Sequence, residues 1–145
     1  GIASGRQMAA ALALGAQGVW CGSVWLGTVE SETDPMVKRR IFASGSKDAV
    51  ITKSMTGKTM RAVRSDWTDA WSRPDAPPAL QMPLQSVMVA EALTRIRRSG
   101  NYDLSSYPAG QVIGQMRGET SVRQIFNEML TQYAETLERL ESIAG

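Results

Sequence analysis

The sequence contains no histidine and only one cysteine, Cys21, among its 145 residues. Without histidine, this segment has no imidazole general base, no histidine-based catalytic triad and no histidine ligand for zinc. A single cysteine cannot form an intrachain disulfide, which fits a reducing compartment. We therefore expect a cytoplasmic protein whose chemistry does not depend on imidazole groups in this segment.

Long hydrophobic runs are absent as well. No stretch approaches the ~20 consecutive apolar residues of a membrane span, and the N-terminus lacks the basic and apolar regions of a signal peptide. The chain begins at Gly1, inside a glycine motif, rather than at a methionine. We expect a fragment or a processed form, and no membrane partner.

The charge is low and scattered, with a net value of +2. Two short basic clusters, Lys38–Arg40 and Arg95–Arg98, have no aromatic residues between them. Nucleic-acid-binding surfaces usually show a broader basic area with aromatic residues. We interpret both clusters as solvated helix faces and expect no nucleic-acid partner.

The first residues follow an α/β pattern. Ser4 and Gln7 have the spacing of a helix capping box, Arg6–Leu14 is rich in helix formers, and Gly15 stands where a left-handed cap would end the helix. Gly18–Gly22 is short, β-prone and bounded by glycines, which is typical of a buried strand. The order of strand end, helix and strand predicts parallel α/β architecture.

The remaining elements are expected as follows: a helix over residues 35–43, short strands over 49–55 and 59–63, a helix over 84–98, a long loop over 101–118, and a final helix with apolar positions from 122 to 140. The four tryptophans, Trp20, Trp25, Trp67 and Trp71, are interpreted as packing residues rather than a stacking box, and Trp67 and Trp71 are one helical turn apart.

Two glycine turns predict a phosphate site. Gly1–Gly5 directly precedes a helix, where free backbone amides can face an anion and glycine lets the backbone approach closely. Gly22–Ser23 follows the next predicted strand and adds a hydroxyl. Each turn alone also fits an ordinary turn before a capped helix. Together they have the arrangement that barrel enzymes use after strands 7 and 8 to bind phosphate.

These residues resemble the flavin-phosphate region of the nitronate monooxygenase (2-nitropropane dioxygenase) family. The matching segments are Gly1–Arg6, Ala10–Val19, Gly22–Ser23, Glu30–Ser31, Thr56–Arg61, Met82–Gln85 and Gly110–Gly114. The glycine turns are shared with other barrels that bind flavin mononucleotide (FMN). The later segments narrow the resemblance to this family and its flavin-dependent enoyl-reductase relatives.

For the fold, the resemblance implies the C-terminal fragment of a (β/α)8 TIM barrel with a mostly helical appended subdomain. A complete barrel needs roughly 250 residues, so this chain cannot close one. We expect residues 1–48 to be the last βαβα units of the barrel, residues 49–118 an appended segment over the barrel mouth, and residues 119–145 a C-terminal helix.

For the site, the resemblance implies that Gly1 donates its amide to the FMN phosphate, as the second glycine of a pair after strand 7. Trp20, Cys21, Gly22 and Ser23 would form the strand-8 block that closes the site. Ser23 keeps the hydroxyl of the threonine that is more frequent there, whereas Trp20 departs from the usual amide side chain.

Five further side chains each have two interpretations. Ser4 is either a helix cap or the counterpart of a histidine that lines the substrate pocket in some relatives. Cys21 is interpreted as a buried strand residue rather than a nucleophile, because no neighbouring Lys or His would activate it. Gln111 is either a flavin contact or a solvent-facing loop residue. Arg61 and Arg64 either bind an acidic substrate such as an acyl-CoA phosphate or pair with nearby carboxylates.

The predicted function is oxidation of alkyl nitronates by molecular oxygen in an FMN-dependent enzyme, with this chain supplying the FMN-phosphate site. The alternative is reduction of an enoyl or other acyl thioester by NAD(P)H-reduced FMN on the same scaffold. A third hypothesis is a non-catalytic helical interaction module. The family's catalytic base lies upstream of this segment, so we name no catalytic residue and no metal ligand here.

Overall fold

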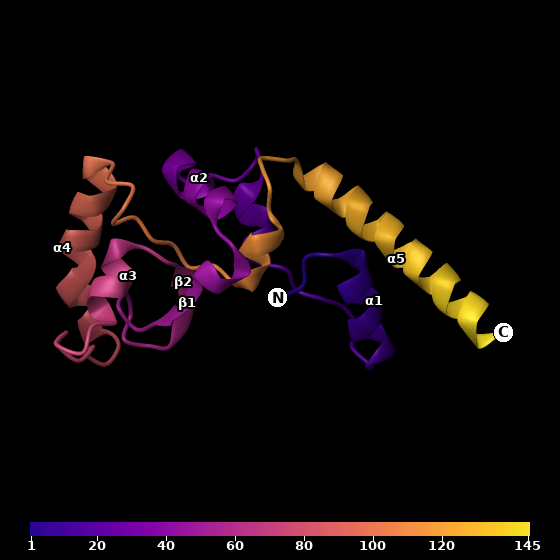
Figure 1. The fold of residues 1–145 in the computed structure, drawn as a ribbon, viewed down its shortest axis with the longest axis horizontal. Helices are drawn as coiled ribbons and strands as arrows, with labels where there is room; N and C mark the ends of the chain where they lie inside the picture. The colour runs from indigo at the N-terminus through magenta and orange to yellow at the C-terminus, as the bar shows by residue number, and fades with distance from the viewer.

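A computed structural model describes residues 1–145 as an elongated set of helices around a small two-stranded sheet (Figure 1). The elements are α1 (Gly5–Ala13), η1 (Ser23–Gly27), α2 (Pro35–Ala43), η2 (Ser46–Asp48), β1 (Ala49–Thr52), β2 (Met60–Val63), α3 (Asp66–Trp71), α4 (Leu84–Ser99), η3 (Gln111–Gln115) and α5 (Val122–Ala144), where η marks a 3-10 helix. The helices α1 and α5 lie at one end of the molecule, and α3 and α4 lie at the other (Figure 1).

The helix α1 has the caps that the sequence predicts. The Ser4 hydroxyl oxygen accepts a hydrogen bond from the Gln7 amide at 3.3 Å. In a capping box, the Gln7 side chain would accept from the Ser4 amide. Here Gln7 Oε1 accepts instead from the amide of the preceding residue, Ala3, at 2.8 Å. Gly15 follows the helix with φ of +99°, a conformation that favours glycine.

The strand predicted over Gly18–Gly22 is not formed, and that prediction was wrong. The segment is not helical and pairs with no other segment, and the sheet of the structure is the antiparallel pair β1–β2. A parallel strand exists only where a neighbour pairs with its backbone groups, and no other part of this chain does so. The parallel sheet of the predicted α/β class is therefore absent from this chain, which contains no complete barrel.

The chain leaves the α1 region and returns to it through two adjacent segments, which we call the neck (residues 28–29 and 119–120). Thr28 and Thr120 form an isolated parallel bridge. The Val29 amide donates to the Thr120 carbonyl oxygen at 2.8 Å. Residues between the two segments therefore form a unit that starts and ends at the neck, and Gly110 of this unit, directly before η3, also contacts Ser23.

That unit has its own hydrophobic core, which joins α2, the sheet and η3. Its buried members are Val37, Ile41, Ala49, Val63, Ala109 and Ile113. In the sheet, Ala49 lies opposite Val63 and Thr52 lies opposite Met60. The expected division at residue 48 separates α2 from β1, although this core packs them together.

Two of the family-like segments meet where α4 is anchored. Gly57 has φ of +80°, and a Cβ there would lie 2.0 Å from the Leu80 carbonyl oxygen. The Gln85 side chain is fully buried, donates from Nε2 to the Ser54 carbonyl oxygen and accepts at Oε1 from the Leu80 amide, both at 2.9 Å. The motif residues Gly57 and Gln85 thus have a structural role.

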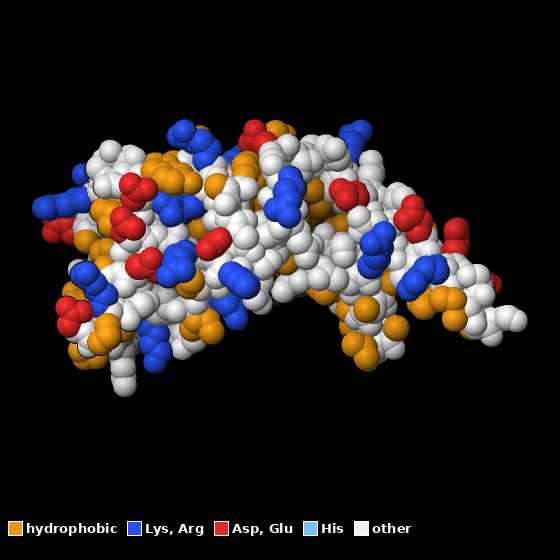
Figure 2. All heavy atoms as spheres, in the orientation of Figure 1, with side chains coloured by type: hydrophobic (Ala, Val, Ile, Leu, Met, Phe, Trp, Pro, Cys, Tyr) orange, Lys and Arg blue, Asp and Glu red, His pale blue; other side chains and the backbone are white.

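The C-terminal helix α5 is confirmed, and Ser121 caps it by accepting from the Gln124 amide at 3.1 Å. Only 23 of 145 residues are buried, so much apolar surface stays uncovered. The exposed apolar side chains at this end of the molecule include Leu14, Trp20, Phe126, Leu130, Leu137 and Leu140. Figure 2 shows hydrophobic side chains gathered at the free end of α1 and beside α5. Even so, every helix falls short of the combined length and apolar character of a membrane span.

Candidate functional site

The two glycine turns lie beside each other, because both contact the segment that begins η3. A Cβ on Gly1 would lie 3.2 Å from Val112 Cγ1. The Ser23 hydroxyl oxygen accepts a hydrogen bond from the Gly110 amide at 2.8 Å. Since Gly110 and Val112 are two residues apart, the turns share one side of the fold, as a common phosphate site requires.

Residues in the first half of α5 pack against both glycine turns. Val24 of η1 forms a buried cluster with Ile125 and Met129 of α5. Residues from both turns pack on this cluster, namely Ile2, Ala3, Cys21 and Trp25. The Trp25 and Phe126 rings stack with centroids 6.1 Å apart. One helix therefore sets the relative position of the two turns.

Several backbone amides at the turns have no hydrogen-bond acceptor within the chain. Those of Ile2, Gly22 and Ser23 are among them. No atom of the chain lies within 4 Å of a Cβ built on Gly22, so the space beside this residue is open. Unpaired amides next to open space are the groups that bind phosphate oxygens.

Some of the backbone amides that were expected to bind an anion already donate to side chains of this chain. The sequence predicts free amides along the whole stretch before α1. In the structure, the Ala3 amide donates to Gln7 Oε1 at 2.8 Å and the Gly5 amide donates to Gln132 Oε1 at 3.1 Å. The amides of Ala3 and Gly5 are therefore not available to an anion, whereas those of Ile2 and Ser4 have no acceptor in the chain.

The 3-10 helix η1 follows the second turn and has no counterpart among the sequence predictions. Its five residues are too few to show helical periodicity. Trp25 Nε1 donates to the Cys21 carbonyl oxygen at 2.8 Å and folds the turn back on itself. Barrel enzymes frequently place a short extra helix of this kind after the last strand, with its N-terminus at the phosphate.

Trp20 and Cys21, the candidate residues that precede Gly22, differ in how far their side chains are buried. The Trp20 side chain is 96% exposed and directed away from the rest of the chain. Cys21 is half-buried against the Val24 cluster, in an unpaired segment instead of the predicted strand. The interpretation of Trp20 as a packing residue was therefore wrong for this chain, while Ser4 serves as the cap of α1.

Arg61 and Arg64, the basic candidates between residues 49 and 118, both have hydrogen-bond partners within the chain. Arg64 pairs with Asp69 at 3.0 Å, and Arg61 Nη1 donates to the Ala49 carbonyl oxygen at 2.7 Å. Arg64 thus pairs with a carboxylate, as the structural interpretation expects, whereas the partner of Arg61 is a backbone carbonyl oxygen. Gln111 is exposed next to Gly110, which contacts Ser23.

The interpretation of Lys38–Arg40 as a solvated face was wrong for two of its three residues. Lys38 is only 8% exposed and donates to the Thr28 carbonyl oxygen and to Glu119 Oε1, both at 2.7 Å. It therefore joins α2 to both segments of the neck. The sequence carries a signal for this position, because Lys38 shares a helix face with the apolar Ile41 at the i,i+3 spacing.

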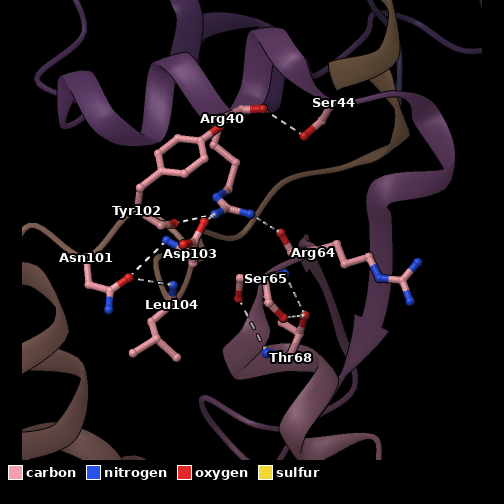
Figure 3. A network of polar contacts seen from close by, with 9 residues as sticks. All are labelled: Arg40, Ser44, Arg64, Ser65, Thr68, Asn101, Tyr102, Asp103 and Leu104. Atoms are coloured by element: carbon pink, nitrogen blue, oxygen red, sulfur yellow. Dashed lines mark hydrogen bonds and ion pairs between the residues drawn. The ribbon is translucent and has the colours of Figure 1, made fainter.

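Arg40 is also enclosed, as Figure 3 shows, with a side chain that is 15% exposed. Its guanidinium lies 4.2 Å from the centre of the Tyr102 ring and donates to the carbonyl oxygens of Arg64 and Tyr102. The contact combines a cation–π interaction with hydrogen bonds. Arg40 thus holds the loop after α4 against the end of β2, whereas Arg39 is exposed.

Comparison with known proteins identifies the family. The sequence profile described as "Nitronate monooxygenase" matches residues 1–132. The chain belongs to the nitronate monooxygenase family. Members of this family are flavin-dependent oxidoreductases.

Individual relatives agree with this assignment. The Mycobacterium tuberculosis protein named "Putative monooxygenase Rv1533" is 46% identical over 149 residues, which is 99% of this chain and 40% of that protein. The structure of FabK from Thermotoga maritima superposes with a TM-score of 0.78 at 30% identity, over 98% of this chain and 45% of that one. Nitroalkane oxidase from Streptomyces ansochromogenes gives a TM-score of 0.81 at 25% identity, over 96% of this chain and 39% of that one.

The share of its relatives that the chain covers accounts for the absence of a parallel sheet. These relatives are TIM-barrel family members, and this chain spans about 40% of their length. Segment 18–22 pairs with no other segment of this chain. The two turns nevertheless stand side by side, because α5 and η3 hold them.

Proposed function

We propose that this chain supplies the FMN-phosphate site of an enzyme that oxidises alkyl nitronates with molecular oxygen. The observation that carries the proposal is the juxtaposition of Gly1 with Gly22 and Ser23, together with the unpaired amides at the two turns. Trp20 and Cys21 complete the proposed cofactor-binding residues through the backbone that leads into the second turn.

The residues present fit a phosphate group. The Ser23 oxygen accepts from Gly110, so its own proton is free to be donated to a phosphate oxygen. The Ile2, Gly22 and Ser23 amides donate to the same anion, and the absent side chain of Gly22 lets it come close. Bound FMN supplies the electron-transfer chemistry, while the chain binds and orients it.

No residue of this chain is proposed as the proton-abstracting base. The chain has no histidine, the Glu119 carboxylate is paired with Lys38, and the Glu30 carboxylate accepts from the Val122 amide. The base of the proposed reaction therefore belongs to the part of the enzyme that this chain does not contain.

The alternative function is NAD(P)H-dependent reduction of an enoyl or other acyl thioester. The 30% identity to FabK, together with the resemblance to flavin-dependent enoyl reductases, supports keeping it. Activity assays on the protein at its natural length distinguish the two functions. Oxygen consumption with propyl-3-nitronate is expected under the first proposal, and NADPH-dependent loss of enoyl absorbance under the second. A helical interaction module is disfavoured by the match over residues 1–132.

The proposed FMN site is tested by Gly22→Val in the protein at its natural length. The branched side chain would crowd the phosphate, so we expect FMN to be lost during purification and its affinity to fall at least about tenfold. Gly18→Val is the matched control, because no chain atom lies within 4 Å of a Cβ at either glycine. Equal FMN retention in the two variants, measured by flavin absorbance per protein, would show that the site has been misplaced.

A further inference from the structure

We infer that Gln132 of α5 is a positioning residue for the phosphate site: it holds the first glycine turn in place without touching the ligand. The inference rests on the proposed function and adds a residue that neither turn contains. Gln132 is 127 positions from Gly5, the residue that it binds.

The Gln132 side chain makes two hydrogen bonds that fix its orientation. Its Oε1 accepts from the Gly5 amide at 3.1 Å, and its Nε2 donates to Glu128 Oε1 at 3.1 Å. If the amide were flipped, its NH2 group would face the Gly5 N–H and its oxygen would face a carboxylate. Glu128 therefore selects the orientation in which Gln132 accepts from α1.

The Gly5 amide needs this acceptor. The first amides of a helix have no partner within the helix, and Gly5 is buried against α5. A Cβ at Gly5 would lie 1.9 Å from the Met129 carbonyl oxygen and 2.5 Å from the Tyr133 nitrogen. With the two backbones this close, water has little access to the Gly5 N–H, and Gln132 is the group that satisfies it.

The second turn is held by the same stretch of α5. Val24 packs on Ile125 and Met129, and Trp25 stacks on Phe126. Gln132 lies one turn beyond Met129 on the same helix and binds the start of α1. The distance between the Ile2 amide and the Ser23 amide, which would bind one phosphate, thus depends on a hydrogen bond from α5.

The experiment measures FMN affinity by flavin-fluorescence titration, and the melting temperature without FMN, in the protein at its natural length. Gln132→Met keeps the side-chain length but removes the acceptor, and we expect FMN affinity to fall about five- to tenfold. Gln132→Glu keeps an acceptor but places a carboxylate against Glu128, so affinity falls as well. In the exchanged pair, Gln132→Glu with Glu128→Gln, the new carboxylate at position 132 accepts from the Gly5 amide, and the new amide at position 128 donates to that carboxylate. We expect FMN affinity within about twofold of the unmodified protein.

Gln124→Met is the matched control. Gln124 lies on the same helix, and its Oε1 accepts only from the exposed Thr120 hydroxyl at 2.9 Å. We expect unchanged FMN affinity in this variant. If Gln132→Met does not fold, the contrast between Gln132→Glu and the exchanged pair decides, because both keep a polar side chain of the same size.

The outcomes separate the two claims. A lower melting temperature with unchanged or higher FMN affinity in Gln132→Met would overturn the positioning role, while Gly22→Val still tests the phosphate site. Failure of the exchanged pair to recover affinity when Gln132→Glu has lost it would also overturn the role. Absence of FMN binding in the unmodified protein would remove the proposed function and this inference with it.

Discussion

Gly5 illustrates how a single residue controls the geometry of this site. Its lack of a side chain lets the backbone of α1 reach the backbone of α5, and the Gly5 amide then meets Gln132. From the sequence, Gly5 is expected among the anion-binding amides. Its position in the structure shows a different use, which is close helix packing.

Gly5→Ala should destabilise the chain by about 2 kcal/mol or more, because the added Cβ meets a backbone oxygen that cannot move alone. Urea unfolding followed by circular dichroism measures the change. Gly18→Ala is the control, since nothing lies within 4 Å of a Cβ there, and it should stay within about 0.5 kcal/mol of the unmodified chain. Similar midpoints for the two variants would contradict the close helix crossing.

Two basic residues of α2 are largely enclosed by the fold. Lys38 and Arg40 occur in a cluster that looks like a solvated helix face, yet each donates to backbone carbonyl oxygens of distant segments. The chain compensates for burying them with Glu119 and with the Tyr102 ring. Composition alone does not distinguish such residues from solvated ones, because the partner segments are far away in sequence.

Among the elements, α4 depends on few contacts for its position. Only two of its sixteen residues, Gln85 and Val89, are buried. Gln85 binds the Ser54 carbonyl oxygen and the Leu80 amide. The family-like segments around Gly57 and Gln85 therefore act together as one anchor for this helix.

Replacing Gln85 with methionine keeps the volume and removes both hydrogen bonds. We expect a loss of about 1–3 kcal/mol in stability, because the buried Ser54 carbonyl oxygen is left unpaired. Gln81→Met is the comparison, since Gln81 is exposed and its side chain makes no hydrogen bond. Thermal denaturation measures both variants, and equal melting temperatures would show that the anchor is unnecessary.

For the whole molecule, the apolar surface along α1 and α5 is the dominant feature. A chain of this length with only 23 buried residues leaves large hydrophobic side chains in water. The relatives are more than twice as long, and Leu130 and Leu137 lie on the uncovered side of α5. Surfaces of this kind usually contact further protein.

We expect this chain on its own to self-associate and to bind a hydrophobic dye. The double variant Leu130→Gln with Leu137→Gln should lower both signals, because both residues are about half exposed, at 53% and 45%. Light scattering after size exclusion and dye fluorescence are the measurements. The protein at its natural length should bind less dye per molecule, and a monomeric chain without dye binding would contradict the expectation.

Family membership, the helices α1, α2, α4 and α5, and the positions of the two glycine turns were predicted from the sequence, whereas α3 and the three 3-10 helices were not. Caps at Ser4, Ser121 and Gly15 and the apolar periodicity of α5 are local features, so residues close together in the chain specify them. The strand predicted over Gly18–Gly22 failed because a strand depends on neighbours that this chain lacks.

Only the tertiary structure decided which amides stay free for an anion. Gln132 takes the Gly5 amide, and the Ser23 hydroxyl takes the Gly110 amide, across 127 and 87 positions of the chain. Hydrogen bonds between such distant residues follow from how α5 and η3 pack on the turns. Local spacing carries no information about that packing, and for this reason the donors of the site could be read only from the folded chain.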